Sequence, residues 1–400
     1  MLWIGVGGGK GFHPLKLGQL AAQKAVEPLG KRKPDLVIVF SSSRLDQKEI
    51  LQGVRSVTGP SPLIGCSGAG QITGNAIDED VVVATLVSDS FRIRTGLGRG
   101  LRQDARKAGQ EAAWNASRDL KEKGRFFLAF SDGLSGKGDD AIRGIQEVLG
   151  TSFPIVGASG ADNFRFEQSF QYYDNQVLQD SLAGALFFGT LAFGIGARHG
   201  WLPLGRSRRV TRAVGNSLEE LDGKPAVSIY EDYFGEGFYE SGEPLARKSL
   251  FYPLGLSMEG EEYLIRHPLR VGAGGSLVCA GEVPEGEEVR LMIGTKDSLL
   301  EATRQASQSA LEGLSGKKAR IVFVFESASR RKLLGLEASQ ELQILRQIFG
   351  EEVPLAGCYD YGEKFPLGDE HHLGQACFLD RKSTRLNSSH SRASRMPSSA

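Results

Sequence analysis

Cysteine, histidine and long apolar runs are scarce in this sequence, and each scarcity excludes a class of protein. The 400 residues include four cysteines, and no two of them form a CxxC pair. This argues against a structural zinc site and gives no sign of a disulfide framework. The most apolar stretch, residues 182–195, is interrupted by glycine and too short to cross a bilayer. The N-terminus also lacks the features of a signal peptide, so we expect a cytoplasmic protein.

The basic residues are unevenly distributed along the chain. Residues 381–400 contain five basic residues, seven serines and no acidic residue. Without this segment, 43 of the 48 basic residues remain against 48 acidic ones, a net charge of about −5 with histidine neutral. An acidic chain without interleaved basic and aromatic residues is not expected to bind nucleic acid. We expect residues 381–400 to be a disordered, non-native extension; the alternative is a basic arm for nucleic acid.

Glycine is abundant, at 52 residues, and one glycine-containing motif occurs three times. Each copy has a proline, two aliphatic residues, a glycine and a small residue: PLIGC at 62–66, PIVGA at 154–158 and PLAGC at 354–358. Before each copy, an apolar run typical of a buried strand ends in polar residues and is followed by a helical pattern. The same order occurs three times, which indicates an internal repeat.

This order of elements predicts the fold class. We expect an α/β protein, of mixed α+β type, in which repeated strand–helix–strand units form mixed β-sheets covered by helices. Between the second and third repeats the pattern changes to short strands joined by turns, at residues 263–266, 276–279 and 288–293. We therefore predict two pseudo-related domains, with residues 1–214 in the first and residues 215–380 in the second.

The strand ends and the glycine turns are the candidate ligand-binding positions. Ligands bind at the carboxyl ends of strands in α/β architectures, because N–H groups and small polar side chains converge there. The alternative is that the glycines only permit close packing. Three recurrences favour a polar cleft. Its predicted residues are Ser41, Ser42, Ser43, Ser131 and Asp132 at strand ends, and Gly65, Cys66, Ser67, Gly157, Ser159, Gly357 and Cys358 at the turns.

Two arginines and three residues near the third turn complete the candidate site. Arg266 and Arg330 could bind an anionic ligand group, since a guanidinium matches a carboxylate through two parallel hydrogen bonds. A surface ion pair is an equally good interpretation of both arginines. Tyr359, Tyr361 and Glu363 flank the third turn and could provide ligand selectivity.

The competing hypothesis is a cysteine-dependent hydrolase or transferase that uses Cys66 or Cys358, because backbone N–H groups at a glycine turn can activate a thiol and stabilise an oxyanion. The second copy of the motif has Ala158 at this position, so the repeated geometry does not itself require a thiol. Adjacent His371 and His372 would point to opposite faces of a strand. We assign no catalytic residue and expect no metal and no cofactor.

The ordered motifs resemble the FIST N-terminal and FIST C-terminal domains. The resemblance rests on the serine-rich strand end and IGCS at 64–67, on YLIRHP at 263–268 and GEVPEG at 281–286, and on PLAGCYDYGE at 354–363. It covers roughly residues 13–380, and EHHLGQ at 370–375 departs from the family pattern. It implies a bacterial intracellular sensory module for signal transduction that binds small ligands such as amino acids or their derivatives. The chain shows no output module, so we expect a separate signalling protein or an oligomer to read the ligand-bound state.

Overall fold

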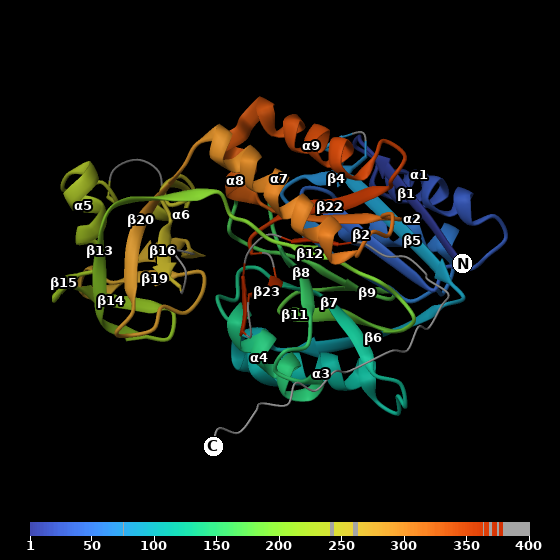
Figure 1. Cartoon of the computed structure of the whole chain (residues 1–400), viewed down its shortest axis with the longest axis horizontal. Coiled ribbons are helices and arrows are strands. Elements are labelled where there is room, and N and C mark those ends of the chain that lie inside the picture. The colour runs from blue at the N-terminus through green and yellow to red at the C-terminus, as the bar shows by residue number, and fades with distance from the viewer. Residues whose placement is uncertain are drawn as a thin grey trace, which may run out of the picture.

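The computed structural model describes residues 1–74, 76–240, 244–258, 263–362, 364–367, 370–373 and 376–378, with side chains up to residue 364. These residues form a large body of sheets and helices and a smaller lobe beside it (Figure 1). The predicted α/β class is confirmed, because mixed sheets are covered by helices. Within the described ranges, no helix is long and apolar enough to cross a membrane.

Three sheets and their helices make up the large body. The first sheet contains, in order, β1 (Leu2–Gly9), β5 (Val81–Ser88), β2 (Leu36–Ser42), β3 (Leu63–Gly68), β9 (Gln171–Tyr173) and β10 (Gln176–Leu178). The second contains β24 (Glu370–Leu373), β23 (Lys364–Leu367), β8 (Ile155–Gly160), β7 (Gly124–Asp132), β11 (Ser181–Gly189) and β6 (Phe91–Arg99). The third contains β12 (Ile195–Gly196), β25 (Ala376–Phe378), β21 (Val322–Ser327), β22 (Leu355–Asp360) and β4 (Gln71–Thr73).

Helices cover the outer face of each sheet (Figure 1). They are α1 (Pro14–Val26) and α2 (Gln47–Thr58) on the first sheet, α3 (Leu101–Ser117) and α4 (Gly138–Leu149) on the second, and α7 (Lys296–Gly313), α8 (Ala328–Leu334) and α9 (Ser339–Phe349) on the third. In β2, Val37 and Val39 face α1 and α2, whereas Ile38 and Phe40 face the other two sheets. Burial on both faces explains why the strands are continuous apolar runs.

The small lobe is built around one antiparallel sheet. Its strands are, in order, β17 (Tyr263–Arg266), β16 (Leu254–Ser257), β20 (Glu288–Gly294), β13 (Trp201–Val214), β14 (Ser217–Leu221), β19 (Leu277–Cys279) and β18 (Pro268–Val271), and β15 (Lys224–Pro225) pairs with β14. Helices α5 (Ser228–Phe234) and α6 (Leu245–Lys248) pack on it. The predicted boundary near residue 215 stays a prediction; in space, the residues beyond it contribute both to this lobe and to the third sheet of the large body.

The internal repeat is visible in the centre of the large body. The pairs β2–β3, β7–β8 and β21–β22 are each parallel and each enclose a helical connection. Phe40, Phe130 and Phe325 hold the same position in the three repeats and meet in the central apolar cluster. Their ring centroids lie 5.4, 5.8 and 6.1 Å apart in edge-to-face contacts, which is a favourable aromatic arrangement. The three repeats therefore pack as near-equivalent units around one core.

The glycines of the three motifs allow two strand backbones to approach closely. A Cβ atom at any of them would lie less than 2 Å from a carbonyl oxygen of the neighbouring parallel strand. These oxygens belong to Val39, Ala129 and Val324, at 1.9 Å from Gly65, 1.9 Å from Gly157 and 1.8 Å from Gly357. Gly65 and Gly157 also have φ angles of 158° and 146°. The geometry supports the packing interpretation of these glycines.

Candidate functional site

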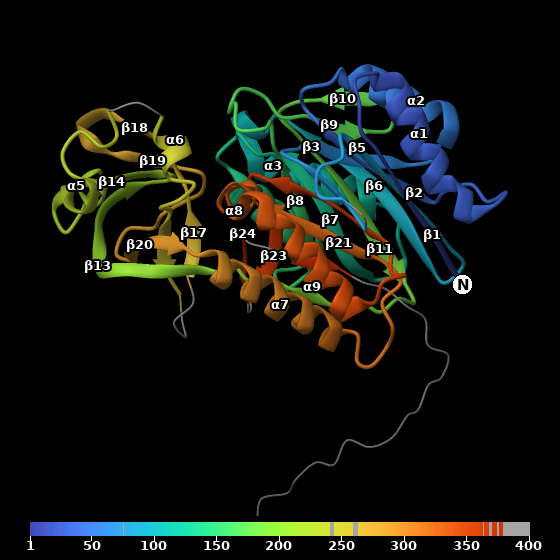
Figure 2. The same ribbon diagram turned by 90° about the horizontal axis from the view of Figure 1, so that it is seen from above.

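A cleft of about 370 Å³ lies between the small lobe and the large body. The large body contributes the carboxyl ends of β21 and β22 and the loop after β7, and the lobe contributes β17, β18, α6 and the start of β13. In Figure 2, α8 of the large body faces the lobe. The cleft therefore opens at the carboxyl ends of parallel strands, which is where ligands bind in many α/β proteins.

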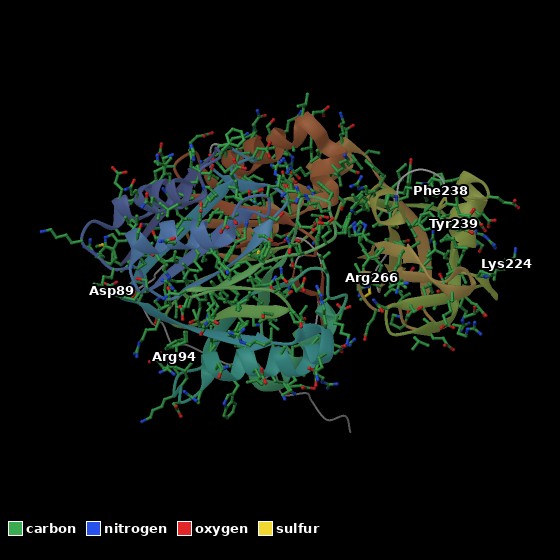
Figure 3. The ribbon with its side chains drawn as sticks, turned by 180° about the vertical axis from the view of Figure 1, so that it is seen from behind. Asp89, Arg94, Lys224, Phe238, Tyr239 and Arg266 are labelled. Atoms are coloured by element: carbon green, nitrogen blue, oxygen red, sulfur yellow. The ribbon has the colours of Figure 1, made fainter. Side chains whose placement is uncertain are left out.

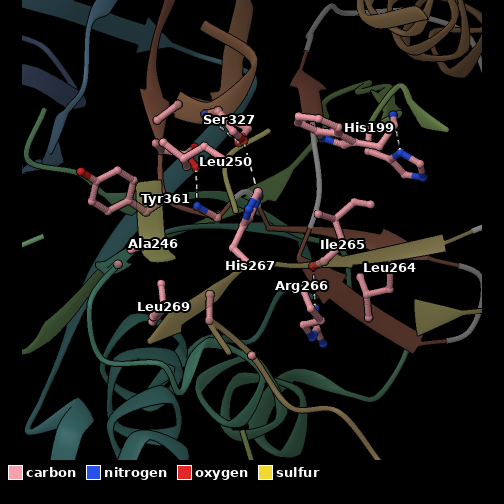
Figure 4. A pocket seen from close by; sticks show the side chains of 18 of the residues that line it. His199, Ala246, Leu250, Leu264, Ile265, Arg266, His267, Leu269, Ser327 and Tyr361 are labelled. Atoms are coloured by element: carbon pink, nitrogen blue, oxygen red, sulfur yellow. Dashed lines mark hydrogen bonds between the residues drawn. The ribbon is translucent and has the colours of Figure 1, made fainter. Parts of the chain in front are cut away.

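Most of the cleft wall is apolar. Side chains from both bodies contribute, among them Leu134, Trp201, Leu250, Leu264, Ile265 and Leu269 (Figure 4). Trp201 is 4% exposed and packs at the start of β13. A concave, mostly apolar surface with a few convergent polar groups is the usual composition of a small-molecule site.

His267 is a polar side chain of the cleft wall (Figure 4). Both of its ring nitrogens have a neighbour. Its Nδ1 lies 3.1 Å from the carbonyl oxygen of Ser249, and its Nε2 lies 3.5 Å from Oγ of Ser329. Because a carbonyl oxygen only accepts hydrogen bonds, Nδ1 carries the proton and Nε2 is an acceptor. Burial lowers the pKa of His267 to about 4, so the ring is neutral at pH 7.

A second histidine and an arginine lie on the β13 side of the cleft. Nδ1 of His199 accepts a hydrogen bond from the backbone N–H of Trp201 at 2.9 Å. Burial, with the positive charges of Arg330 and Arg198, lowers the pKa of His199 to about 4. Arg198 is exposed, donates to the carbonyl of Ala197 at 2.7 Å, and has no ion-pair partner in the described part of the chain. Arg198 is therefore the cleft's available cation.

Arg266 lines the cleft, as the sequence analysis expected of a site residue, but its guanidinium is already paired. Nη2 lies 3.0 Å from Oδ2 of Asp139, and Nε donates to the carbonyl of Glu282 at 2.7 Å. The side chains of Arg266 and Asp139 are 4% and 6% exposed. This buried ion pair connects β17 of the lobe to α4 of the large body, at the junction visible in Figure 3. The contact of Arg266 with Asp139 favours the ion-pair interpretation of this arginine, although the ion pair is buried and not at the surface.

Arg330 does not line the cleft and is completely buried. Its Nε lies 2.9 Å from Oε2 of Glu326, and its Nη2 lies 2.5 Å from Oε1 of Glu341. The hydroxyl of Tyr359 donates to Oε2 of Glu341 at 2.9 Å, and burial raises the pKa of Tyr359 well above its usual value. Arg330 also donates to the carbonyl of His199 at 3.1 Å. This buried network therefore links β21, β22, α8 and α9 to one another and to His199 in the cleft wall.

Tyr361 lines the cleft beside the end of β22. Its hydroxyl donates to Oδ1 of Asp162 at 2.6 Å and accepts from the backbone N–H of Phe164 at 2.7 Å. The hydroxyl of Tyr361 is therefore already engaged within the protein, and its ring stacks on Phe166 with the centroids 5.0 Å apart. Glu363 lies outside the described residues.

The other predicted strand-end residues lie within the large body and do not line the cleft. Some of their hydrogen bonds join neighbouring repeats: Ser67 Oγ donates to the carbonyl of Ala161 at 2.7 Å, and Ser159 Oγ accepts from Nζ of buried Lys364 at 2.8 Å. Others stay within one repeat, such as the hydrogen bond that Ser169 Oγ donates to Oδ1 of Asp132 at 2.7 Å. The residues concerned are Ser41, Ser42, Ser43, Ser67, Ser131, Asp132 and Ser159. The polar strand ends thus stabilise contacts between repeats.

The predicted glycines and cysteines also lie away from the cleft. Gly65, Gly157 and Gly357 contact neighbouring strand backbones, as described above. Cys66 and Cys358 are 0% exposed and belong to the central apolar cluster, so a substrate in the cleft does not reach either thiol. In the described ranges, no three histidine, cysteine or acidic side chains are placed to hold a metal ion. The side chains of His371 and His372 lie outside the described part.

Of the residues that line the cleft, sequence reasoning selected Arg266 and Tyr361 as site residues but not His267, Ser327 or Ser329. His267 belongs to the YLIRHP motif, and Ser327 and Ser329 follow the strand of the third repeat, so each had a local signal. The sequence did not show that these residues lie close together, because His267 of the lobe and Ser329 of the third repeat are about 60 positions apart.

Two family models match adjoining parts of the chain. The model of the FIST N domain matches residues 35–224, and the model of the FIST C domain matches residues 226–366. The chain belongs to the FIST family. The resemblance stated from the motifs is therefore confirmed, and FIST domains are associated with sensing in signal transduction.

Similar proteins extend the comparison without assigning a ligand. The uncharacterized protein MJ1623 of Methanocaldococcus jannaschii is 27% identical over 235 residues, which are 56% of this FIST chain and 45% of that protein. The match thus spans about half the length of the relative. A chorismatase crystal structure gives a TM-score of 0.37 at 8% identity, covering 95% of this chain and 98% of the other. A cyanuric acid hydrolase from A. caulinodans gives 0.36 at 8% identity, covering 96% and 100%. Such low scores carry no functional argument.

Proposed function

We propose that this FIST protein is a sensor that binds a small molecule in the cleft between its two bodies. The observation that carries the proposal is the cleft itself, whose volume of about 370 Å³ lies in the range of small-ligand sites. A ligand in the cleft touches the lobe and the large body at once. It therefore favours one arrangement of the two bodies, and a separate signalling protein or a second copy of the chain can respond to that change in population.

The lining suggests a ligand with an apolar part and an anionic group. Trp201, Leu250 and Leu264 offer an apolar surface, which suits an aromatic or branched aliphatic side chain. Arg198 is the cation available for a carboxylate, and a guanidinium binds carboxylates through charge-assisted hydrogen bonds. An amino acid with a large apolar side chain, or its N-acyl derivative, combines both features. This ligand class is more apolar than the polar ligand that the serine-rich strand ends suggested from the sequence.

A thermal-shift screen of the full chain with amino acids, their derivatives and other carboxylates tests the proposal. One ligand class should raise the melting temperature, with a stabilisation of about 2.7 kcal/mol at a ligand concentration 100 times Kd. Replacing Ala280, which lines the cleft and is partly exposed in it, with phenylalanine should abolish the shift. The matched control is Ala273→Phe, because Ala273 is exposed in the same lobe and does not line the cleft. A shift that survives Ala280→Phe would place the ligand elsewhere.

A second experiment tests the carboxylate contact. Arg198→Ala should weaken binding of the carboxylate ligand by about 10-fold to 100-fold, which corresponds to a charge-assisted hydrogen bond of about 1.5–3 kcal/mol. The same variant should bind the corresponding carboxamide with the affinity of the native chain. Arg209→Ala is the control, since Arg209 is exposed on β13 and does not line the cleft. Equal affinities for both variants would exclude Arg198 from ligand binding.

A further inference from the structure

The cleft contains a serine and a histidine in the arrangement of a nucleophile and its base. We propose that the protein hydrolyses a small carboxylic ester in this cleft, with Ser329 Oγ as the nucleophile and His267 Nε2 as the general base. The inference rests on the proposed function, because the substrate occupies the same cleft as the sensed ligand. It differs from the cysteine hypothesis in the position of the reacting groups. Ser329, which is 1% exposed, and His267 both line the cleft, whereas the two cysteines of that hypothesis lie in the central apolar cluster and do not line it.

The base is oriented by a third group, as a general base in nucleophilic catalysis requires. Nδ1–H of His267 donates to the carbonyl oxygen of Ser249 at 3.1 Å, which fixes the tautomer and leaves the Nε2 lone pair facing the cleft. Ser249 is itself 0% exposed, and its hydroxyl donates to the carbonyl of Pro268 at 2.7 Å. The imidazole is therefore held between α6 and β18 with its accepting nitrogen directed at the large body.

The nucleophile is contributed by the large body. Ser329 lies in the first turn of α8, and its Oγ is 3.5 Å from Nε2 of His267. This distance exceeds that of a formed hydrogen bond, and catalytic hydrogen bonds are often long before substrate binds. Ser327 Oγ lies 2.5 Å from Ser329 Oγ, and it accepts the backbone N–H of Ser329 at 3.3 Å. When Ser327 donates its proton to Ser329, the proton of Ser329 is directed at His267.

The pair spans two bodies, so a substrate in the cleft lies against both reacting groups. Ser329 belongs to the third repeat and His267 connects β17 to β18. The distance of 3.5 Å therefore depends on how closely the lobe approaches the large body. The apolar walls suit an ester with an apolar acyl or alcohol part.

The reaction balances with water as the sole co-substrate. Ser329 Oγ forms a bond to the ester carbonyl carbon while its proton passes to Nε2 of His267. The bond between that carbon and the alkoxy oxygen then breaks, and His267 returns the proton to the leaving alcohol. A water molecule, deprotonated by His267, then attacks the acyl carbon. The bond between that carbon and Ser329 Oγ breaks, His267 returns the proton to Oγ, and the carboxylic acid and free Ser329 are released. The carboxylic acid product has the chemistry proposed above for the sensed ligand.

Labelling of the full native chain with an alkyl fluorophosphonate, read by intact mass and peptide mapping, tests the inference. We expect one label per chain, located on Ser329. Ser329→Ala should lose the label, and His267→Gln should label at least 100-fold more slowly, in line with the contribution of a general base. Ser339→Ala, at an exposed serine of α9, should label as the native chain does. Hydrolysis of p-nitrophenyl esters of increasing acyl length should follow the same order.

The outcomes separate this inference from the proposed sensor function. Ligand-induced thermal shifts without labelling would overturn the hydrolase inference and leave the sensor proposal standing. Labelling of Ser329 without any ligand-induced shift would support the hydrolase inference and count against the sensor proposal. A label on another serine, or equal rates for His267→Gln and the native chain, would overturn the hydrolase inference. Peptide mapping of the native chain decides the question even if a variant does not fold.

Discussion

Replacing Gly157 with alanine should destabilise the protein far more than replacing Gly150, although both have positive φ angles, of 146° and 114°. Both glycines lie in the second repeat, Gly150 at the end of α4 and Gly157 in β8. A Cβ atom at Gly157 would lie 1.9 Å from the carbonyl oxygen of Ala129, whereas a Cβ atom at Gly150 would meet nothing within 4 Å. Both substitutions therefore strain the backbone, but only Gly157→Ala also places a Cβ atom against the neighbouring strand.

The size of the difference follows from these distances. Alanine at these positive φ angles costs about 1–3 kcal/mol at either position. At Gly157, β8 must also move by more than an ångström relative to β7, because real Cβ contacts essentially never fall below 3.0 Å. Overpacking of this kind costs about 1–3 kcal/mol or more, and the shift weakens hydrogen bonds between the two strands that contribute about 1 kcal/mol each. The free energy of unfolding should fall by about 4 kcal/mol or more in Gly157→Ala and by about 1–3 kcal/mol in Gly150→Ala.

Urea unfolding, followed by far-UV circular dichroism, measures both variants against the native chain. Gly65→Ala and Gly357→Ala should resemble Gly157→Ala, because their Cβ atoms would meet the equivalent strand oxygens at 1.9 and 1.8 Å. A loss in Gly157→Ala within about 1 kcal/mol of that in Gly150→Ala would refute the reasoning. So would a large loss in one repeat and none in the other two, since the three repeats share this contact.

The remaining predictions concern buried charges and histidine. Asp139→Asn removes the counterion of buried Arg266, so urea unfolding should show a loss of about 3 kcal/mol or more. Arg330→Met removes the cation bound by buried Glu341 and should cost as much in the same assay. Burial lowers the pKa of His267 to about 4, below the unfolded value of about 6.5. Below pH 6.5 the unfolded chain binds a proton that the folded chain does not. The contribution of His267 to the free energy of unfolding is therefore fully present above pH 6.5 and is lost as the pH falls to about 4. His267→Gln should reduce this loss, by up to about 3 kcal/mol.

Matched controls make these predictions refutable. Arg143 and Glu282 form another ion pair between the two bodies, at 2.7 Å, but their side chains are 46% and 33% exposed. Arg143→Ala should therefore cost less than about 1 kcal/mol. A cost of Asp139→Asn no greater than this would contradict the role given to burial. The control for the pH prediction is His13→Gln, because His13 is exposed. If the free energy of unfolding of both His267→Gln and His13→Gln depends on pH as that of the native chain does, His267 is not held neutral.

The repeated architecture could be predicted from the sequence because it is encoded locally. Continuous apolar runs such as residues 36–40 predicted strands buried on both faces, and the structure has β2 between helices on one side and the central cluster on the other. The recurring order of elements predicted repeated strand–helix–strand units, and in the structure each unit contains a parallel strand pair with its glycine at the same register. Strand periodicity and turn chemistry are properties of short segments, so one sequence suffices to read them.

The cleft could not be predicted in the same way, because it depends on contacts between distant segments. Arg266 and Tyr361 were selected and do line the cleft, but the partner of Arg266 is Asp139, 127 positions away. The serines at the ends of β2 and β7 have the same local pattern as Ser327 and Ser329, yet of these serines only Ser327 and Ser329 line the cleft. A strand-end serine has the same sequence signal whether it joins two repeats or lines a cleft, so tertiary contacts decide its role.

Fluorescence of Trp201 tests the central claim, that ligand binds between the two bodies, most directly. The chain has three tryptophans, and Trp201 lines the cleft. Trp3 and Trp114 do not, so replacing both with phenylalanine leaves a single reporter in the cleft wall. We predict that a ligand found by thermal shift changes the emission of this single-tryptophan chain, saturating with the same Kd. Unchanged Trp201 emission at ligand concentrations that saturate the thermal shift would contradict the claim.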